Sequence, residues 1–439
     1  MSMRSLVLVV AGLAMAPNLA AAQQGADAAR PIALADAVRL AQINSPTTIA
    51  ARNALRTSEA GVRQSLLQYL PTLNLSYTST QAGGTQFVGG TAVPAQGFPW
   101  TYSRGLNSQL TIFDGGQRWY NYRAADAGLD ANLATEVTQR YVVALGVKQQ
   151  YYAILAARES DAAAQRQLEQ AEQNLKVAAA KMAAGAATRA DSLQAAVGVG
   201  NARLAILTAE NLVLNANAAL TRLVASPIMV TAVESDTSTG ARIDLSTDSL
   251  SRLVTEGPAV QQAALTLVAA KAGHKAQTTP YLPTLSATAS YGQNPKGSEG
   301  FDWGTGPATT RTSLGFSMSY TVFDNYKREQ SLVLARVAED NADAQYRDQK
   351  FLAQQNLTQQ LANFRTAEQK IELQLLTIQQ SDEALRVVQQ RYNLGTAALL
   401  EVLTAQTALD NARAALIQAR LDARTAKANI EALIGRDLP

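Results

Sequence analysis

The chain has 439 residues, a formal net charge of +3 and no cysteine. Because cysteine is absent, a disulfide framework, a thiolate metal site and a cysteine nucleophile are excluded. Lysine and arginine are scattered rather than clustered, so the sequence gives no support for nucleic-acid binding. Only 17% of the residues are charged and 6% aromatic, which is typical of long helices packed through small side chains.

Residues 1–22 have the pattern of a cleaved secretory signal peptide. Arg4 precedes an apolar run from Leu6 to Met15, and three alanines end at Ala22, before Gln23. A short membrane anchor is the alternative, but this run is too short to span a bilayer. No cysteine follows, so we expect no lipid-anchored amino terminus. No other segment approaches the roughly 18 apolar residues that suggest a transmembrane helix.

The second half of the chain repeats the first at an offset that moves only from 212 to 210 residues. A period this long indicates one large supersecondary block used twice, not a solenoid of small units. We expect a first structural repeat at 23–224, a linker rich in Ser, Thr and Asp at 225–247, and a second repeat at 248–439. The repeated marks are Tyr69-Leu70-Pro71-Thr72-Leu73 with Tyr281-Leu282-Pro283-Thr284-Leu285, Thr111-Ile112-Phe113-Asp114 with Thr321-Val322-Phe323-Asp324, and Gly185 with Gly395.

Each repeat opens with a helical stretch, at about 34–68 and 249–277. Pro71 and Pro283 stop these stretches, because proline lacks a donor and pushes the preceding residue out of helical space. The apolar period then changes from about 3.6 to 2, which predicts two strands per repeat joined by loops at about 83–105 and 293–311. The predicted strands cover about 72–82, 106–114, 284–292 and 312–323.

The predicted strands have one apolar face and one face of small polar residues. Such strands are typical of a membrane barrel with lipid outside and water inside. A water-soluble sandwich is the alternative, but the four strands leave no partner sheet. Four strands cannot close a barrel, and an open edge in lipid has unsatisfied backbone groups. The chain must therefore oligomerise, and the residues alone do not choose between two copies with eight strands and three copies with twelve.

Long helices follow each strand pair, at about 117–183 and 327–393, each on the order of 100 Å. A heptad seam marks the second of them, and Gly185 and Gly395 end the two runs. Returning helices at 189–224 and 397–434 carry a 4-3 pattern rich in alanine, without a polar residue. We predict a mainly α fold with a membrane β part, in which a β-barrel is continued by a helical coiled-coil barrel. The seam residues are Leu357, Phe364, Ile371, Ile378, Leu385 and Tyr392.

The sequence motifs described above occur twice and in the same order. In this respect the chain resembles the TolC-type outer membrane efflux proteins over essentially all of its mature length. The resemblance rests also on Phe113-Asp114-Gly115-Gly116 and on Arg391 to Thr396 leading into Glu401, Leu403 and Ala405. It implies a homotrimer in the outer membrane, with a twelve-stranded barrel and a twelve-helix periplasmic tunnel. It also implies a periplasmic adaptor and an inner-membrane RND or ABC pump as partners, in an efflux or type I secretion system.

The resemblance further implies a gate near the helix turns, with Asp191 and Glu401 as a carboxylate ring and Tyr392 as the gate tyrosine. Two positions depart from the family pattern: Ala397 stands in place of an arginine, and Thr404 in place of a second carboxylate. Such a gate is looser, or is held by Arg189 or Arg391.

Plain structural roles compete with these gate assignments. Thr188-x-x-Asp191 is a capping-box pattern, and a carboxylate in a first helical turn is favoured by the helix dipole. Glu401 can be a solvated residue on a helix face, and Tyr392 can serve packing alone, because it lies on the heptad seam.

No catalytic constellation is present, so we expect no enzyme and no cofactor. His274, the sole histidine, is expected at the surface or in packing. A trimeric helical stalk or adhesin is the alternative to a channel, but strand pairs at equal places in both repeats favour a continuous tube. Within the channel interpretation, the sequence does not separate export of small toxic compounds from export of secreted protein.

Overall fold

The computed structural model describes residues 29–81, 83–94, 100–233, 243, 246–295, 301 and 303–438. The predicted signal peptide lies outside these residues, as do residues 234–242, 244 and 245 of the predicted linker. The chain divides into two compact units. The first comprises the described residues within Met1–Ser45, Val143–Ala241 and Asn363–Ala428, and the second those within Pro46–Val142, Arg242–Ala362 and Asn429–Pro439.

Four long helices make up nearly half of the chain, in two pairs that match at an offset of 210 residues. Helices α3 (Gln117–Ala183) and α7 (Lys327–Asn393) have 67 residues each. Helices α4 (Arg189–Val224) and α8 (Leu399–Ile434) have 36 residues each. Three of these helices have the predicted bounds, while α8 begins two residues later than predicted. The internal repeat of the sequence is therefore a repeat of structure.

The alanine-rich 4-3 pattern of the returning helices is their buried face. In α4, Ala195, Val199 and Ala202 are buried, and in α8 the same holds for Leu409, Ala412 and Leu416. The heptad seam of α7 is also largely buried, with Leu357 at 3% exposure, Phe364 at 4% and Leu385 at 7%. Small side chains on these faces let neighbouring helices approach closely.

The opening helical stretch of each repeat is two helices, not the single one we predicted. In the first repeat, α1 (Leu34–Asn44) and α2 (Pro46–Leu67) are separated by Ser45, whose backbone is extended at φ −61° and ψ 131°. In the second, α5 (Thr247–Thr255) and α6 (Pro258–Ala276) are separated at Glu256 and Gly257. The residue before a proline avoids helical space, so Pro46 and Pro258 begin new helices.

In the first unit, part of the linker is held against the long helices. Strand β6 (Val230–Ala232) pairs in parallel with β1 (Arg30–Ile32). The guanidinium of Arg158 donates to the Ala232 carbonyl at 2.9 Å and to the Thr231 hydroxyl at 2.7 Å. Tyr151 and Leu220 are fully buried in the core beside this small sheet. The described end of the linker is therefore packed rather than free.

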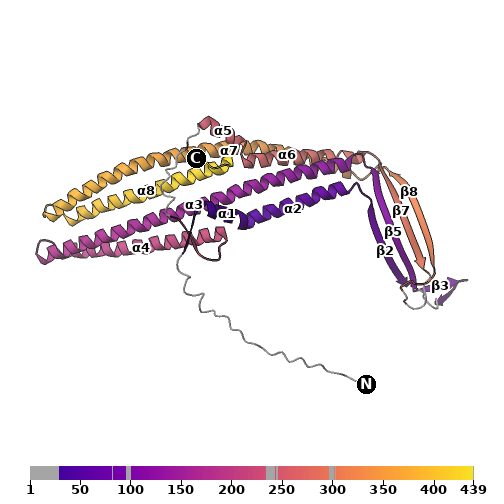
Figure 1. Ribbon diagram of the computed structural model, residues 1–439, viewed down its shortest axis with the longest axis horizontal. Coiled ribbons are helices and arrows are strands. Elements are labelled where there is room, and N and C mark those ends of the chain that lie inside the picture. Colours follow the sequence, from indigo (N-terminus) through magenta and orange to yellow (C-terminus); the bar gives the residue numbers. More distant parts are fainter. Residues whose placement is uncertain are drawn as a thin grey trace, which may run out of the picture. The chain divides into compact units, whose positions relative to one another are not determined.

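The second unit contains an antiparallel sheet of four strands in the order β2-β5-β7-β8, which lie side by side in Figure 1. A separate hairpin of β3 (Thr85–Val88) and β4 (Thr91–Pro94) lies between β2 and β5 in the sequence. Within the described part of the chain, β2 and β8 are the outer strands and pair on one side only. The four strands are β2 (Thr72–Gln81), β5 (Trp100–Phe113), β7 (Thr284–Pro295) and β8 (Ala308–Ser319).

The strand ends differ from prediction in ways that pairing explains. Strand β8 covers Ala308–Ser319 rather than 312–323, because its partner β7 starts at Thr284, directly after Pro283, and the pair Thr284–Ser319 is the last. Strand β5 starts at Trp100 rather than 106, because Gln81 of β2 pairs with it there. Strand β7 continues to Pro295, three residues past the predicted end. Alternation of residue types did not reveal these bounds.

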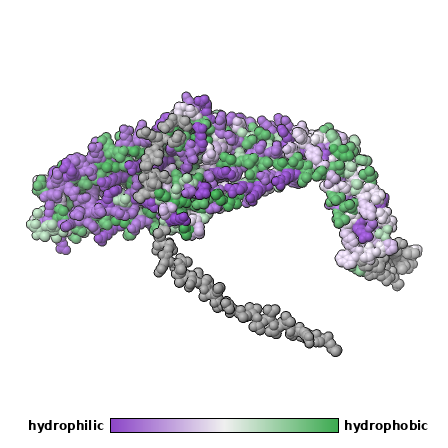
Figure 2. Space-filling model, in the orientation of Figure 1, coloured by the Kyte–Doolittle hydropathy of each residue, from purple (hydrophilic) through white to green (hydrophobic). Residues whose placement is uncertain are grey.

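The register gives the sheet two different faces. Leu75 pairs with Leu106, which pairs with Tyr291, and this face is strongly exposed, with Leu75 at 84% and Phe316 at 69%. On the opposite face, Ser290 and Ser313 join their hydroxyls at 2.6 Å. Figure 2 shows hydrophobic residues gathered over the strands, whereas polar residues dominate along the helices. The polar face consists of small residues such as Thr72, Asn74, Ser76, Asn107, Gln109, Ser286, Thr288, Ser317 and Gly315.

Candidate functional site

The repeated Tyr-Leu-Pro-Thr-Leu and Phe-Asp motifs meet at the junction of helix and strand. Pro71 directly precedes β2, and Asp114 directly follows β5. One Asp114 oxygen accepts the backbone N–H of Arg118 at 3.1 Å and its Nε–H at 2.8 Å. The guanidinium of Arg118 lies 4.8 Å above the ring of Tyr69. The junction therefore fastens the end of one helix to the start of the next.

The second repeat builds the same junction after Pro283. Asp324 accepts from the backbone N–H and the Nε–H of Arg328, both at 3.0 Å, and Arg328 lies 5.0 Å above the ring of Tyr281. Sequence reasoning missed both arginines. The available signal was an arginine four residues after each motif aspartate, repeated at an offset of 210.

At the turn between α3 and α4, the predicted cap is confirmed. Gly185 has φ +74°, which favours glycine, and the Ala186 N–H donates to the Lys181 carbonyl at 2.8 Å. Thr188 and Asp191 form a complete capping box, with Asp191 N–H to the Thr188 hydroxyl at 3.2 Å and Thr188 N–H to the Asp191 carboxylate at 2.9 Å. Two hydrogen bonds from Thr188 lower the pKa of Asp191. The larger effect comes from the backbone N–H, and the smaller one from the hydroxyl.

The turn between α7 and α8 has the same backbone but different side-chain bonds. Gly395 has φ +78°. One oxygen of Glu401 accepts the Ala398 N–H at 3.2 Å, and the other lies 3.4 Å from the Arg391 guanidinium. That guanidinium also donates to the Thr396 carbonyl at 3.2 Å. Glu401 is thus a half-exposed carboxylate engaged on both oxygens, and its contact with Arg391 was among those we considered.

Tyr392 is buried at 7% exposure and is held by a cation from the other repeat. The Lys181 ammonium lies 3.9 Å from the ring centroid and donates to the Tyr392 backbone carbonyl. A cation there also suits the carboxyl end of α7. Burial raises the pKa of Tyr392, and the negative charge of Asp191 raises it further by a smaller amount. Sequence reasoning missed Lys181, although it occupies the position that Arg391 has in the second repeat.

Thr404 is not hydrogen-bonded through its side chain to the other predicted gate residues in the described part of the chain. Its hydroxyl donates to the Leu400 carbonyl at 2.8 Å, within its own helix. Ala397, where an arginine was expected, is partly buried against the apolar cluster that contains Leu385, Tyr392 and Leu399. Residues of α3, α4, α7 and α8 share this cluster, so the two turns are packed together.

Polar bonds also join the two repeats further along these helices. Asn174 of α3 donates to Gln406 of α8 at 2.9 Å, and both side chains are buried. Gln389 of α7 donates to Asn174 at 3.3 Å. Arg420 of α8 lies 3.4 Å from Glu159 of α3. Because buried amides are costly unless they are bonded, these contacts fix how the helices of the first unit are matched.

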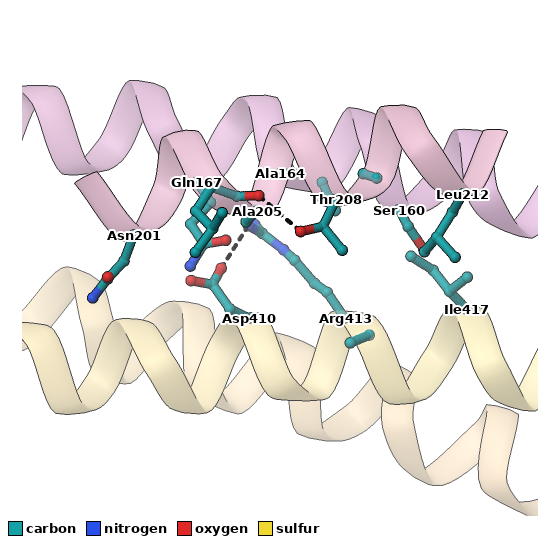
Figure 3. A pocket seen from close by; sticks show the side chains of 14 residues that line it. Ser160, Ala164, Gln167, Asn201, Ala205, Thr208, Leu212, Asp410, Arg413 and Ile417 are labelled. Carbon is teal, nitrogen blue, oxygen red and sulfur yellow. Dashed lines mark hydrogen bonds and ion pairs between the residues drawn. The ribbon is translucent and has the colours of Figure 1, made fainter. Parts of the chain in front are cut away.

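A cavity of about 550 Å³ lies between α3, α4 and α8. Figure 3 shows Asp410 and Arg413 of α8 reaching toward the first repeat, and Leu212 of α4 facing Ile417. Asp410 is only 21% exposed and lies 4.0 Å from Arg413. Burial raises the pKa of Asp410, and the charge of Arg413 opposes this increase.

The described residues offer no candidate metal centre. They contain no cluster of three or more His, Asp or Glu side chains that could hold a metal ion. The Nδ1 atom of His274 lies 2.6 Å from the Glu339 carboxylate, and both side chains are partly exposed. Among the described residues, no helix combines the length and apolar character needed to cross a membrane.

Comparisons with known proteins agree with the duplicated architecture. A family model described as outer membrane efflux protein matches residues 37–226 and again 250–436. The pyoverdine export outer membrane protein OpmQ of Pseudomonas aeruginosa is 26% identical over 326 residues, which cover 73% of this chain and 67% of that protein. The probable efflux pump outer membrane protein TtgC of Pseudomonas putida is 27% identical over 179 residues, 40% of this chain and 36% of that protein.

Solved structures show the same fold at low identity. The outer membrane protein VceC of Vibrio cholerae superposes with a TM-score of 0.75 at 20% identity, over 92% of this chain and 97% of that one. The outer membrane channel CmeC of Campylobacter jejuni superposes with a TM-score of 0.78 at 18% identity, over 98% of this chain and 94% of that one.

Proposed function

The chain belongs to the outer membrane efflux protein family, and we propose that it is the outer membrane exit duct of a tripartite export system. In this proposal three copies form the duct. A periplasmic adaptor and an inner-membrane pump of the RND or ABC type deliver the substrate, which the duct conducts passively to the exterior. The predicted signal peptide brings the chain to the periplasm, from which it inserts into the outer membrane.

One observation carries the proposal: the sheet has a lipid-compatible face and two open edges. Leu73, Leu75 and Phe316 are 68%, 84% and 69% exposed on one face, while the other face is polar. Outward apolar and inward polar residues are the pattern of a membrane barrel. Since β2 and β8 pair on one side only, other copies must supply the missing strands in lipid. Family membership favours three copies, and so twelve strands.

The duct is proposed to pass its cargo without tight binding. The polar face of the sheet carries small hydroxyl and amide side chains, some of which bond to one another, as Ser286 and Ser317 do at 2.9 Å. The names of relatives mention pyoverdine export and the efflux of antibiotics and toluene. These names support small compounds over secreted protein as cargo, so we assign a small-molecule efflux system.

We place the gate of the duct at the helix turns. Asp191 and Glu401 are the proposed carboxylate ring, since they occupy equivalent first-turn positions after the turn glycines Gly185 and Gly395. Thr404 follows one turn later as an uncharged member of this region. Tyr392 supports the proposal by joining the turns of both repeats through Lys181.

The test is the conductance of the purified mature protein in planar bilayers, with its oligomer mass measured in the same detergent. We expect a trimer with small, discrete openings that cations block. Glu401→Ala should increase the conductance and weaken the block, whereas Glu169→Ala, a change at an exposed site on α3, should do neither. A soluble monomer that does not insert would contradict the duct. A trimer that stays closed even with its adaptor would favour a stalk.

A further inference from the structure

The apolar face of the four-stranded sheet carries a cation. The four strands contain two arginines and no aspartate or glutamate. Arg104 is exposed and lies on the apolar face, because it alternates with Leu106 along β5 and pairs with Tyr77 of β2. Arg311 pairs with Gly292 and lies on the opposite, polar face. Within these strands, Arg104 is therefore a charge on the lipid-compatible face with no carboxylate to neutralise it.

Arg104 lies where the apolar face ends, on the side remote from the helix junction. Along β5, Leu106 is the last aliphatic residue of this face, and Arg104, Tyr102 and Trp100 follow it. A charge on the lipid face of a barrel is costly at the bilayer midplane and nearly free at the interface, which tyrosine and tryptophan girdles mark. In the duct this end of the strands faces the exterior, so Arg104 is expected at the height of the outer lipid head groups.

Aromatic rings form a platform beside Arg104. The ring of Tyr77, the β2 partner of Arg104, lies 6.4 Å from that of Trp303. Trp303 contacts Phe301 edge-on at 4.9 Å, and Phe301 lies 5.9 Å from Tyr102. Tyr102 is only 2% exposed beneath these rings, whereas Tyr77 and Trp303 are 45% and 67% exposed. The platform is thus anchored to the sheet and still offers ring surface next to the guanidinium.

A short chain of hydrogen bonds fixes the guanidinium and leaves donors free. The Nε–H of Arg104 donates to Oε1 of Gln293 at 2.8 Å, and Nε2 of Gln293 donates to the Tyr291 hydroxyl at 2.7 Å. Because that hydroxyl accepts, its own O–H can still donate. In the described part of the chain, the two terminal nitrogens of Arg104 have no hydrogen-bond or ion-pair partner. An oriented guanidinium and a phenol therefore present donors on the apolar face.

We propose that Arg104 and Tyr291 bind the phosphate of an anionic lipid in the outer leaflet. This inference rests on the proposed duct, because it needs the sheet in a membrane with this end of the strands outside. A planar guanidinium can donate two parallel hydrogen bonds to a phosphate. The site spans β5 and β7, the two inner strands of the sheet, so one copy of the chain completes it.

A lipid is the occupant because the ligand must carry negative charge and hydrocarbon together. The cation shares its face with Leu75 and Phe316, which are 84% and 69% exposed, and acyl chains can cover this surface. A soluble anion would gain nothing from these residues. A lipid phosphate, in contrast, neutralises Arg104 at the one height where head groups lie.

The site is tested by native mass spectrometry of the purified mature trimer, titrated with diphosphorylated lipid A or with the same lipid after its phosphates are removed. Arg104→Gln should weaken binding of the phosphorylated lipid about tenfold. The dephosphorylated lipid should bind the natural protein about as weakly. The matched control is Arg311→Gln, which removes the same charge from the polar face and should leave binding unchanged. Equal binding by the natural protein and Arg104→Gln overturns the site.

Two milder variants separate the contacts and keep the test valid if Arg104→Gln does not assemble. Tyr291→Phe removes only the hydroxyl and should weaken binding about threefold, while Arg104→Lys keeps the charge without the planar fork and should bind with intermediate affinity. Unchanged binding by both variants overturns the assignment of these two side chains.

A competition experiment separates a lipid site from a simple anion site. A large excess of inorganic phosphate should not displace lipid A, because inorganic phosphate has no acyl chains to cover the apolar face. Displacement would overturn the lipid as occupant. A trimer that binds phosphorylated lipid equally with and without Arg104 overturns this inference alone, whereas a soluble monomer overturns the duct as well.

Discussion

Arg118 lies with its guanidinium 4.8 Å above the ring of Tyr69, and the same side chain pairs with Asp114 at 2.8 Å. Arg328 and Tyr281 reproduce this relationship at 5.0 Å. The tyrosine belongs to the segment that enters a strand, and the aspartate to the segment that leaves the next one. The arginine therefore couples the two connections between helix and sheet, which explains why the Tyr-Leu-Pro and Phe-Asp motifs repeat together.

Arg118→Met should weaken this junction strongly. The Arg118 and Asp114 side chains are only 13% and 11% exposed, so the change leaves a largely buried carboxylate without its cation. We expect a loss of about 3 kcal/mol in the free energy of unfolding. Chemical unfolding in detergent measures it, with Arg63→Met, at an exposed site on α2, as the control. A loss equal to that of the control would contradict the coupling.

The second turn should accept the cap that it lacks. Ala398 stands where Thr188 stands in the first repeat, and Glu401 already accepts the Ala398 N–H at 3.2 Å. Ala398→Thr should therefore stabilise the protein by about 1 kcal/mol, and Thr188→Ala should destabilise it by a similar amount. Ala398→Val has the same shape without the hydroxyl and should give no gain. Equal effects of threonine and valine would count against a completed cap.

The capping box at Asp191 should fail in acid. Hydrogen bonds from Thr188 lower its pKa. Its contribution to the free energy of unfolding is therefore present above the unfolded pKa of about 3.9, and is lost as pH falls through the lower, folded value. Asp191→Asn should accordingly be less stable than the natural protein at pH 7, and the difference should shrink below about pH 4. Thermal unfolding over this pH range measures the effect. A difference that stays constant into strong acid would be inconsistent with it.

The two faces of the sheet should tolerate charge very differently. Phe316 lies on the exposed apolar face and Ser317 on the polar face of the same strand. Phe316→Arg should cost about 2–4 kcal/mol in the membrane, whereas Ser317→Arg should insert normally and change only the conductance. The yield of detergent-resistant oligomer in outer membranes separates the two variants. The reverse order would mean that the faces have been assigned the wrong way round.

Asp410 should show the opposite pH dependence to Asp191. Burial raises its pKa, and the charge of Arg413 opposes this increase. The folded protein therefore keeps its full stability below the unfolded pKa of about 3.9, and loses stability as pH rises through the higher, folded value, because the buried carboxyl group then ionises. Asp410→Asn should therefore gain stability relative to the natural protein as the pH rises above about 4. Unfolding midpoints at several pH values measure this gain. An unchanged difference across the range would show that Arg413 offsets the burial.

Local sequence signals located the long helices well and the strand ends poorly. Gly185 and Gly395 end helices by supplying a left-handed residue, which is a local property, so α3 and α7 have their predicted ends. The end of β8 depends on Pro283, which limits its partner strand. Pairing of this kind cannot be read from one segment, because alternation continues past Ser319 in the sequence.

The site shows the same division. Thr188 and Asp191 are three residues apart, so their capping box was predictable. Lys181 and Tyr392, 211 residues apart, meet only when the two repeats pack together. No spacing rule links them, and the comparison of repeats at an offset of 210 is the signal that would have singled out Lys181.

By itself the sequence determined the duplication, the bounds of the two longest helices, the turns that end them and the alternation of the strands, since all of these follow from short-range geometry and periodicity. Tertiary structure alone decided which arginines stack on the motif tyrosines and how the bonds around Glu401 and Tyr392 are shared. The physical reason is that burial and long-range hydrogen bonds depend on how distant segments pack, and two repeats with equal backbones can place different side chains at equivalent contacts.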